Sequence, residues 1–185
     1  MQYDVVDLIM QDHREVERLF DELKNHPEKR PLLTPVICGL LVAHSRAEES
    51  EVYPVAKQEA GETDEVEHSQ HEHAEAEQLL AKLLDCDYDS PQYDQMLAEV
   101  VEAITHHVQE EEKSVLPGMK TRLSDERRQE LGEKFARVRA EHLGDIPGQA
   151  SREELLAQAR NLGLPNATSM SKSELQRELQ KAAAE

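Results

Sequence analysis

The sequence predicts an all-α protein: an up-down-up-down four-helix bundle built from two repeated helical hairpins, followed by a fifth helix and a small C-terminal helix-loop-helix. Three observations lead to this prediction. Aromatic residues make up only 3% of the 185 residues, and strong helix formers such as Ala, Leu and Glu are common. Apolar residues recur at helical spacing through four long segments. These segments form two copies of one pattern, over residues 1–60 and 61–120.

Composition limits the class of partner and the compartment. A net charge of −18 argues against a general nucleic-acid or anionic-membrane surface, so we expect neither as a partner. No apolar run approaches the ~20 residues that span a bilayer, and the acidic N-terminus has no signal-peptide pattern. Cys38 and Cys86 do not make a disulfide framework. We therefore expect a cytoplasmic protein.

The first hairpin is expected to consist of helices over about residues 4–24 and 33–57, with Pro27 and Pro31 in the loop between them. His13 takes the one missing place in the apolar row of the first helix, so it points into the core. Pro35 lies in the first turn of the second helix, and Pro54 is expected to kink its last turn. The inward row of that helix is Ile37, Leu41, His44, Glu48 and Val52.

The second hairpin, with helices over about residues 65–84 and 92–116, repeats these positions. His73 follows His13 by 60 residues, and the pair His107 and Glu111 follows the first pair by 63. The repeat selects His107 over its neighbour His106, whose counterpart is an alanine. Short loops make consecutive helices antiparallel neighbours, and the repeat predicts approximate two-fold symmetry. The polar residues of the two halves are therefore expected to meet at the axis.

The rest of the chain follows the bundle domain, residues 1–120, in three parts. Residues 121–144 are expected to form an additional helix that Ser124 caps and that lies against the bundle. Residues 145–150 form a linker, and residues 151–185 form a helix-loop-helix module. Capping boxes at the starts of its two helices support this assignment: Ser151 with Glu154, and Ser171 with Glu174.

Six inward ionisable residues form the candidate site: His13, His44, Glu48, His73, His107 and Glu111. Burying them without a compensating ion is costly, and a metal pair removes much of that cost. Six nitrogen and oxygen ligands are too many for one tetrahedral zinc and too rich in histidine for Ca²⁺ or Mg²⁺. We expect two ions, each held by two histidines, with both glutamates bridging them. Iron suits this ligand set best, with manganese or zinc as alternatives. Open positions can take an oxo or hydroxo bridge, peroxide or O₂.

The solitary histidines complete the two His-x-x-x-Glu pairs. His13 is expected to join His44 and Glu48, and His73 to join His107 and Glu111.

The order His13, His44-x-x-x-Glu48, His73, His107-x-x-x-Glu111 resembles the hemerythrin-like, or HHE cation-binding, family. The stretches DHREVERLF at residues 12–20 and EEEKSVLP at residues 110–117 also look typical of it. The resemblance covers roughly residues 4–120 and implies a non-haem di-iron centre held by these six residues. Glu77 stands where the oxygen carriers of the family have a further histidine. The pattern thus looks like the bacterial subgroup linked to peroxide breakdown or to iron and oxygen sensing.

Several further residues have open roles. Tyr53 either packs at the bundle end or brings a phenolate to an open iron position. Glu49 and Glu112 flank the ligands and are candidates for supporting them. We interpret His68 and His71 as surface residues.

The C-terminal module resembles the small helix-loop-helix at the N-terminus of transcription termination factor Rho, through ELLAQARNLGL at residues 154–164 and MSKSELQ at residues 170–176. In related units this module can serve nucleic-acid contact. Its basic residues are balanced here by acids, and it has no aromatic residue on which bases could stack. We therefore expect an accessory or protein-contact role.

These observations lead to three functional hypotheses. The first is a di-iron enzyme that decomposes hydrogen peroxide, like a catalase, in oxidative-stress defence. The second is a protein that senses or binds O₂, NO or iron without turnover. The third is a bundle whose metal is purely structural and closed to small molecules.

Overall fold

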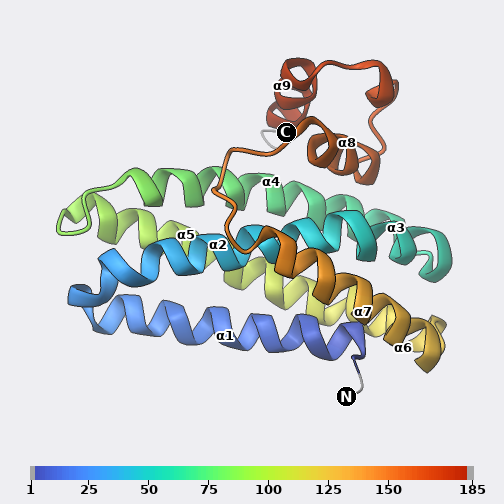
Figure 1. Ribbon diagram of the computed structural model, residues 1–185, viewed down its shortest axis with the longest axis horizontal. Coiled ribbons are helices and arrows are strands. Elements are labelled where there is room, and N and C mark those ends of the chain that lie inside the picture. Colours follow the sequence, from blue (N-terminus) through green and yellow to red (C-terminus); the bar gives the residue numbers. More distant parts are fainter. Residues whose placement is uncertain (1–2, 183–185) are drawn as a thin grey trace.

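The computed structural model describes residues 3–182, and this range contains helices and no strand, which confirms the all-α prediction (Figure 1). The domains proposed from the sequence include residues 1–2 and 183–185, which lie outside the described residues, and their boundaries stay predictions. The four bundle helices are α1 (Val5–Asn25), α2 (Arg30–Ala47), α4 (Thr63–Asp85) and α5 (Pro91–Lys113).

The starts of these helices follow from local chemistry. The side chain of Asp4 accepts a hydrogen bond from the backbone N–H of Val6 at 2.9 Å, and so caps α1. Helix α2 begins at Arg30, earlier than expected, because Pro31 fits its first turn. The expectation that Pro35 occupies that turn was wrong, since Pro35 lies in the helix interior.

The second helix was expected to run to about residue 57 with a kink at Pro54, but α2 ends at Ala47 and wider turns follow it. After α2 the chain continues through η2 (Glu48–Val52), α3 (Tyr53–Val55) and η3 (Ala56–Ala60), and both η2 and η3 are π-helical. Pro54 explains the change, because its ring clashes with the carbonyl four residues earlier and it has no N–H to donate. Helix α5 also ends early, at Lys113, and resumes as α6 (Val115–Arg122), which contains Pro117. Each half therefore departs from a regular helix within a few residues of its inward glutamate.

The apolar core of the bundle is divided into two clusters. One lies around Ile9, Tyr53 and Leu116, and the other around Phe20, Leu80 and Leu97. The six inward ionisable residues belong to neither cluster although all six are buried. They form a polar layer across the core, and the apolar clusters on either side shield this layer from water.

Helix α7 (Asp125–His142) lies across α1 and α2, as expected (Figure 1). Ser124 caps it, and Leu131, Phe135 and Val138 are buried against the bundle. Gly132 permits the close approach, because a Cβ at this position would lie 1.7 Å from the backbone oxygen of Tyr3. The face formed by α1 and α2 is thereby covered.

The C-terminal module consists of α8 (Arg152–Asn161), η4 (Ala167–Ser169) and α9 (Lys172–Ala182). It has a small apolar cluster of its own around Leu155, Ala159 and Leu175. Figure 1 shows it beside α4, and α8 packs against both α4 and η2. Over residues 3–182, no helix combines the length and the apolar character needed to cross a membrane.

Candidate metal centre

The six inward residues gather at the middle of the bundle, and each is at most 5% exposed. His13 comes from α1, His73 from α4, and the two His-x-x-x-Glu pairs from α2 with η2 and from α5. Within one pair, His44 Nε2 lies 3.1 Å from Glu48 Oε1. The repeat thus brings four separate segments to one place, as a metal centre requires.

The potential ligand atoms fall into two groups, and within each group all atoms lie within 4.8 Å of one another. One group contains His13, His44, Glu48 and Glu111, and the other contains Glu48, His73 and His107. Glu48 therefore spans both groups, as a bridging ligand would.

The solitary histidines contact the carboxylate of the opposite half. His13 Nε2 lies 3.3 Å from Glu111 Oε2, and His73 Nε2 lies 3.3 Å from Glu48 Oε2. Both glutamates were expected to bridge the two ions, and in the structure Glu48 is grouped with His73 and His107 whereas Glu111 is grouped with His13 and His44 only. Four helices around one axis bring each solitary histidine close to the glutamate of the other hairpin.

The centre contains buried polar atoms that fit a metal. Among the described residues, five such atoms have no hydrogen-bond partner: His13 Nε2, His44 Nε2, both carboxylate oxygens of Glu48, and Glu111 Oε2. An unsatisfied buried polar group costs about 1–3 kcal/mol, and a charged one costs more. Imidazole nitrogens and carboxylate oxygens pointing at one another are metal-ligand types, so a cation at this place satisfies all five atoms.

Each of the four histidines also has a carboxylate behind its ring, at Nδ1. Glu112 Oε1 lies 2.9 Å from His13 Nδ1, and Glu49 Oε1 lies 3.3 Å from His73 Nδ1. These contacts place Glu49 and Glu112 where carboxylates that support the candidate ligands would lie. A carboxylate here makes Nδ1 the protonated nitrogen and leaves Nε2 free for a metal.

The other two supporting carboxylates were missed by sequence reasoning. Asp12 Oδ2 lies 3.1 Å from His44 Nδ1, and Glu72 Oε2 lies 2.9 Å from His107 Nδ1. The signal was present, because both acids directly precede a solitary histidine and are related by the same 60-residue shift. In each hairpin, the solitary histidine is thus a candidate ligand, and the acid before it contacts the histidine of the next helix.

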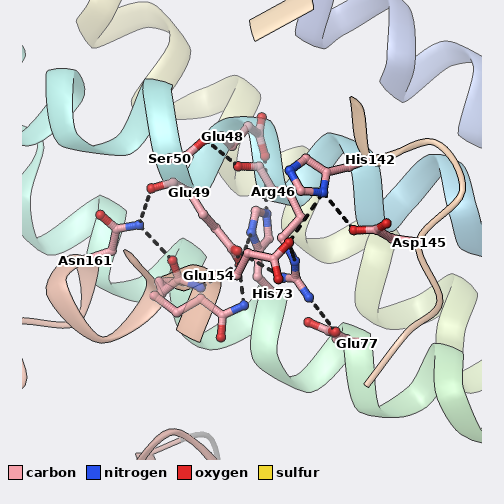
Figure 2. Close-up of polar contacts among 12 residues, drawn as sticks. Arg46, Glu48, Glu49, Ser50, His73, Glu77, His142, Asp145, Glu154 and Asn161 are labelled. Carbon is pink, nitrogen blue, oxygen red and sulfur yellow. Dashed lines mark hydrogen bonds and ion pairs between the residues drawn. The ribbon is translucent and has the colours of Figure 1, made fainter. Parts of the chain in front are cut away.

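Glu49, behind His73, is enclosed in a network of hydrogen bonds and ion pairs (Figure 2). Its Oε2 accepts hydrogen bonds from Arg46 at 3.1 Å and Gln158 at 3.0 Å, and its Oε1 accepts one from Gln70 at 2.9 Å. The amide of Asn161 donates to the backbone oxygen of Glu49 at 2.9 Å. Since Gln158 and Asn161 belong to α8, the C-terminal module provides part of the hydrogen-bonding environment of Glu49.

Tyr53 lies at the centre rather than only packing at the bundle end. Its hydroxyl is 3.0 Å from His73 Nε2 and 3.5 Å from Glu111 Oε1. In a regular α-helix, the side chains of residues five apart point about 140° away from each other. The π-helical turn bonds the N–H of Tyr53 to the carbonyl of Glu48 and so brings both side chains to one side. Pro54 was the sequence signal for this turn.

The protonation of the metal-free centre follows from its close charges. Burial alone would lower the pKa of His44, but the charge of Glu48 and the hydrogen bond to Asp12 outweigh it and raise the pKa to about 10. The pKa of His73 is raised to about 9, because Glu48 and Glu49 outweigh the effect of burial. Burial and the nearby carboxylates raise the pKa of Tyr53 well above its usual range. A metal must therefore displace protons from both histidines.

A cavity of about 20 Å³ adjoins all four histidines. Most of its remaining wall is apolar, and the wall includes Leu41, Ala76 and Ile104. The volume is slightly above the ~10–15 Å³ that one water needs. The cavity therefore has room for about one small molecule.

Glu77, at the position of the further histidine in oxygen carriers, also borders this cavity. Its Oε1 accepts hydrogen bonds from Arg46 at 2.6 Å and from the backbone N–H of Gly148 at 2.9 Å. Glu77 therefore holds the linker to the C-terminal module in place and is absent from both ligand groups.

Comparison with known proteins places the chain in a family. Residues 4–119 match the model of the hemerythrin HHE cation binding domain. Over 149 residues, 80% of this chain, it is 27% identical to a DNA nickase of Nostoc sp., and the match covers 42% of that protein. It is 26% identical over 139 residues to an uncharacterised hemerythrin-like protein of Schizosaccharomyces pombe, a match that covers 73% of this chain and 68% of the relative. No solved structure gives a significant match.

The match covers the four bundle helices, and the structure brings the histidines and glutamates of those helices into one buried cluster. The chain therefore belongs to the hemerythrin HHE cation-binding domain family, and the cluster at the middle of its bundle is a hemerythrin-type cation site.

Proposed function

We propose that the protein is a non-haem di-iron enzyme that decomposes hydrogen peroxide. The observation that carries this proposal is the small, largely apolar cavity beside a centre rich in unsatisfied ligand atoms. His13, His44 and Glu111 would hold one iron, His73 and His107 the other, and Glu48 both. Mixed imidazole and carboxylate ligation with open positions supports iron. Iron would supply the redox chemistry by which two peroxide molecules become two waters and O₂.

The side chains around the centre would serve this reaction in three ways. The four carboxylates at Nδ1 fix the imidazole rings and raise their basicity. The apolar wall limits the volume open to water, so the metal positions stay available to a small molecule. The hydroxyl oxygen of Tyr53 lies 3.0 Å from His73 Nε2 and 3.5 Å from Glu111 Oε1, so its proton would be within reach of a molecule bound between His73 and Glu111.

Oxygen release tests the proposal. The iron-loaded protein is mixed with hydrogen peroxide in an oxygen electrode, and the same concentration of free iron is the control. We expect O₂ release far above that of free iron. If the loaded protein releases no more O₂ than free iron, the proposal is wrong.

The size of the cavity also favours a second function, binding or sensing of O₂, NO or iron without turnover. This function predicts a reversible change in the visible spectrum when O₂ or NO is added and then removed, and no O₂ release from peroxide. A closed structural site, the third hypothesis, predicts neither response.

The similarity to the DNA nickase favours one further test, because it extends over 80% of this chain. The net charge of −18 opposes binding to phosphates, so we expect no nicking. The test measures whether the iron-loaded protein converts supercoiled plasmid to the open circle in the presence of a radical scavenger. If it does, and a Glu48→Gln variant does not, nicking activity would be assigned to this protein instead.

A further inference from the structure

Glu72 has one satisfied and one unsatisfied carboxylate oxygen. Its Oε2 lies 2.9 Å from His107 Nδ1 and so supports a ligand of the buried centre. Its Oε1 is buried and has no hydrogen-bond partner among the described residues. Two exposed imidazoles face that second oxygen: His68 Nε2 lies 3.3 Å away and His106 Nε2 lies 3.4 Å away. The three atoms converge on the outer face of α4 and α5.

The arrangement of the two rings favours a shared ligand between them. His68 precedes Glu72 by one helical turn on α4, while His106 reaches the same oxygen from α5. The ring centroids are 6.4 Å apart and the ring planes are almost perpendicular, at 89°. The rings therefore do not stack on each other, and one ligand atom from each ring and one from Glu72 all lie within 4.8 Å of one another.

In the first half of the bundle, the residue equivalent to Glu72 is paired with a cation. Asp12, the counterpart of Glu72, supports His44 and is also bound by the guanidinium of Arg139 at 2.6 and 2.8 Å. A cation thus satisfies the outer side of that carboxylate. No Lys or Arg is paired with Glu72 among the described residues, and α7, which carries Arg139, covers α1 and α2 instead. At Glu72, two histidines therefore occupy the place that Arg139 occupies at Asp12.

These histidines belong to the second half alone. Shifting the repeat places Leu8 at the position of His68 and Ala43 at the position of His106. The residues beside them attract cations. A groove of about 860 Å³ includes Glu72 and His106 in its lining together with Glu75, Glu99 and Glu102, and Lys24 is its one Lys or Arg. The negative potential of such a groove concentrates cations at the triad.

We propose that His68 Nε2, His106 Nε2 and Glu72 Oε1 form a second metal site, at the surface, for a divalent transition metal such as Zn²⁺ or Fe²⁺. Two imidazoles and one carboxylate are a common ligand set for these ions and leave further positions for water. The site is distinct from the buried centre, and Glu72 connects the two by contacting His107 with its other oxygen. The proposal does not depend on which metal the buried centre holds.

Zinc binding tests this proposal. The full chain is dialysed against Zn²⁺ alone, and bound zinc per chain is measured for the wild type and for the double variant His68→Gln/His106→Gln. We expect the double variant to bind one zinc fewer per chain. This difference is expected whether the buried centre contains iron or zinc, because the variant keeps all of the buried ligands. Equal zinc content in the two proteins, at all concentrations up to ~100 μM, would overturn the proposal.

A matched control separates the triad from general effects of removing histidine. His71→Gln changes a half-buried histidine of α4 that lies outside the triad. We expect this variant to bind as much zinc as the wild type, and the helical circular dichroism of all three proteins to agree. Loss of the same zinc in His71→Gln would contradict the assignment. The iron content of the buried centre, measured on the same variants, reports separately on the proposed function.

Discussion

The two halves of the bundle present nearly the same inward ligands, but different neighbours surround them. Behind His13 and His44, Glu112 contacts Arg14, and Asp12 pairs with Arg139 of α7. Behind His73, Glu49 is 2% exposed and covered by α8, whereas the side chain of Glu112 is 24% exposed. The repeat therefore places the inward residues, while α7 and α8, which lie outside the repeat, contribute different neighbours to the two halves. We expect two metal positions of unequal affinity.

Replacing the inward glutamates should give the largest effects and tests this comparison. Glu48 belongs to both ligand groups and Glu111 to one. Glu48→Gln should therefore release both irons, with a loss of affinity above the ~10–100-fold typical of supporting residues. Glu111→Gln should mainly weaken the position at His13 and His44. Iron per chain after dialysis against a chelator measures both. Equal losses in the two variants would show that the halves are equivalent.

The supporting glutamates give a matched pair with a smaller effect. Glu49→Gln removes a fully enclosed charge behind His73, and Glu112→Gln removes a partly exposed one behind His13. We expect Glu49→Gln to lower metal affinity ~10–100-fold, and Glu112→Gln to fall at or below the lower end of that range. Competition with a coloured chelator gives both affinities. A larger loss of metal affinity in Glu112→Gln than in Glu49→Gln would contradict this expectation.

The contribution of the C-terminal module should be smaller again. Gln158→Ala removes a buried hydrogen bond to the charged Glu49 and should destabilise the protein by ~1.5–3 kcal/mol in urea unfolding. Gln180→Ala, at an exposed position of α9, is the control and should stay within ~0.5 kcal/mol of the wild type. If Gln158→Ala is as stable as the control, the module does not support the centre.

The metal-free and metal-loaded proteins should also differ in the sign of their dependence on pH. In the metal-free protein the pKa of His44 is about 10 and that of His73 about 9, above the 6.5 of a free histidine. The stability that these raised values contribute is complete below pH 6.5 and is lost as the pH rises through 9 and 10. Metal affinity should instead rise over this range, because binding displaces the protons. Thermal unfolding with and without metal, from pH 6 to 9, checks both signs, and a metal-free protein that gains stability across this range would contradict the expectation.

Most of the fold was predictable because the repeat and helical periodicity act over many residues. The four bundle helices, the covering helix α7 and both helices of the module occur near their expected positions. The exceptions are local and involve proline. Pro54 was expected to kink a helix, whereas the chain forms a π-helical turn that places the side chains of Tyr53 and Glu48 on the same side. Periodicity analysis assumes a constant angle per residue, so it cannot anticipate such a change.

The candidate site was predictable in its inward residues and less so in their pairing. Spacing placed the six residues on inward faces, but it could not show that His73 contacts Glu48 rather than Glu111, because this depends on how four helices are rotated. It also assigned His68 to the surface without placing it beside Glu72 and His106. That convergence depends on the register between α4 and α5. The boundaries of the domains, and protein contact through residues 151–185, stay predictions.

The iron content of the buried centre tests the proposed di-iron function most directly. It is best measured on the His68→Gln/His106→Gln variant, where the proposed surface site cannot contribute. Protein loaded with Fe²⁺ and freed of excess metal should retain two iron ions per chain, and the same protein carrying Glu48→Gln in addition should retain none. One iron or fewer in the first protein, or unchanged iron in the second, would contradict a di-iron centre held by Glu48.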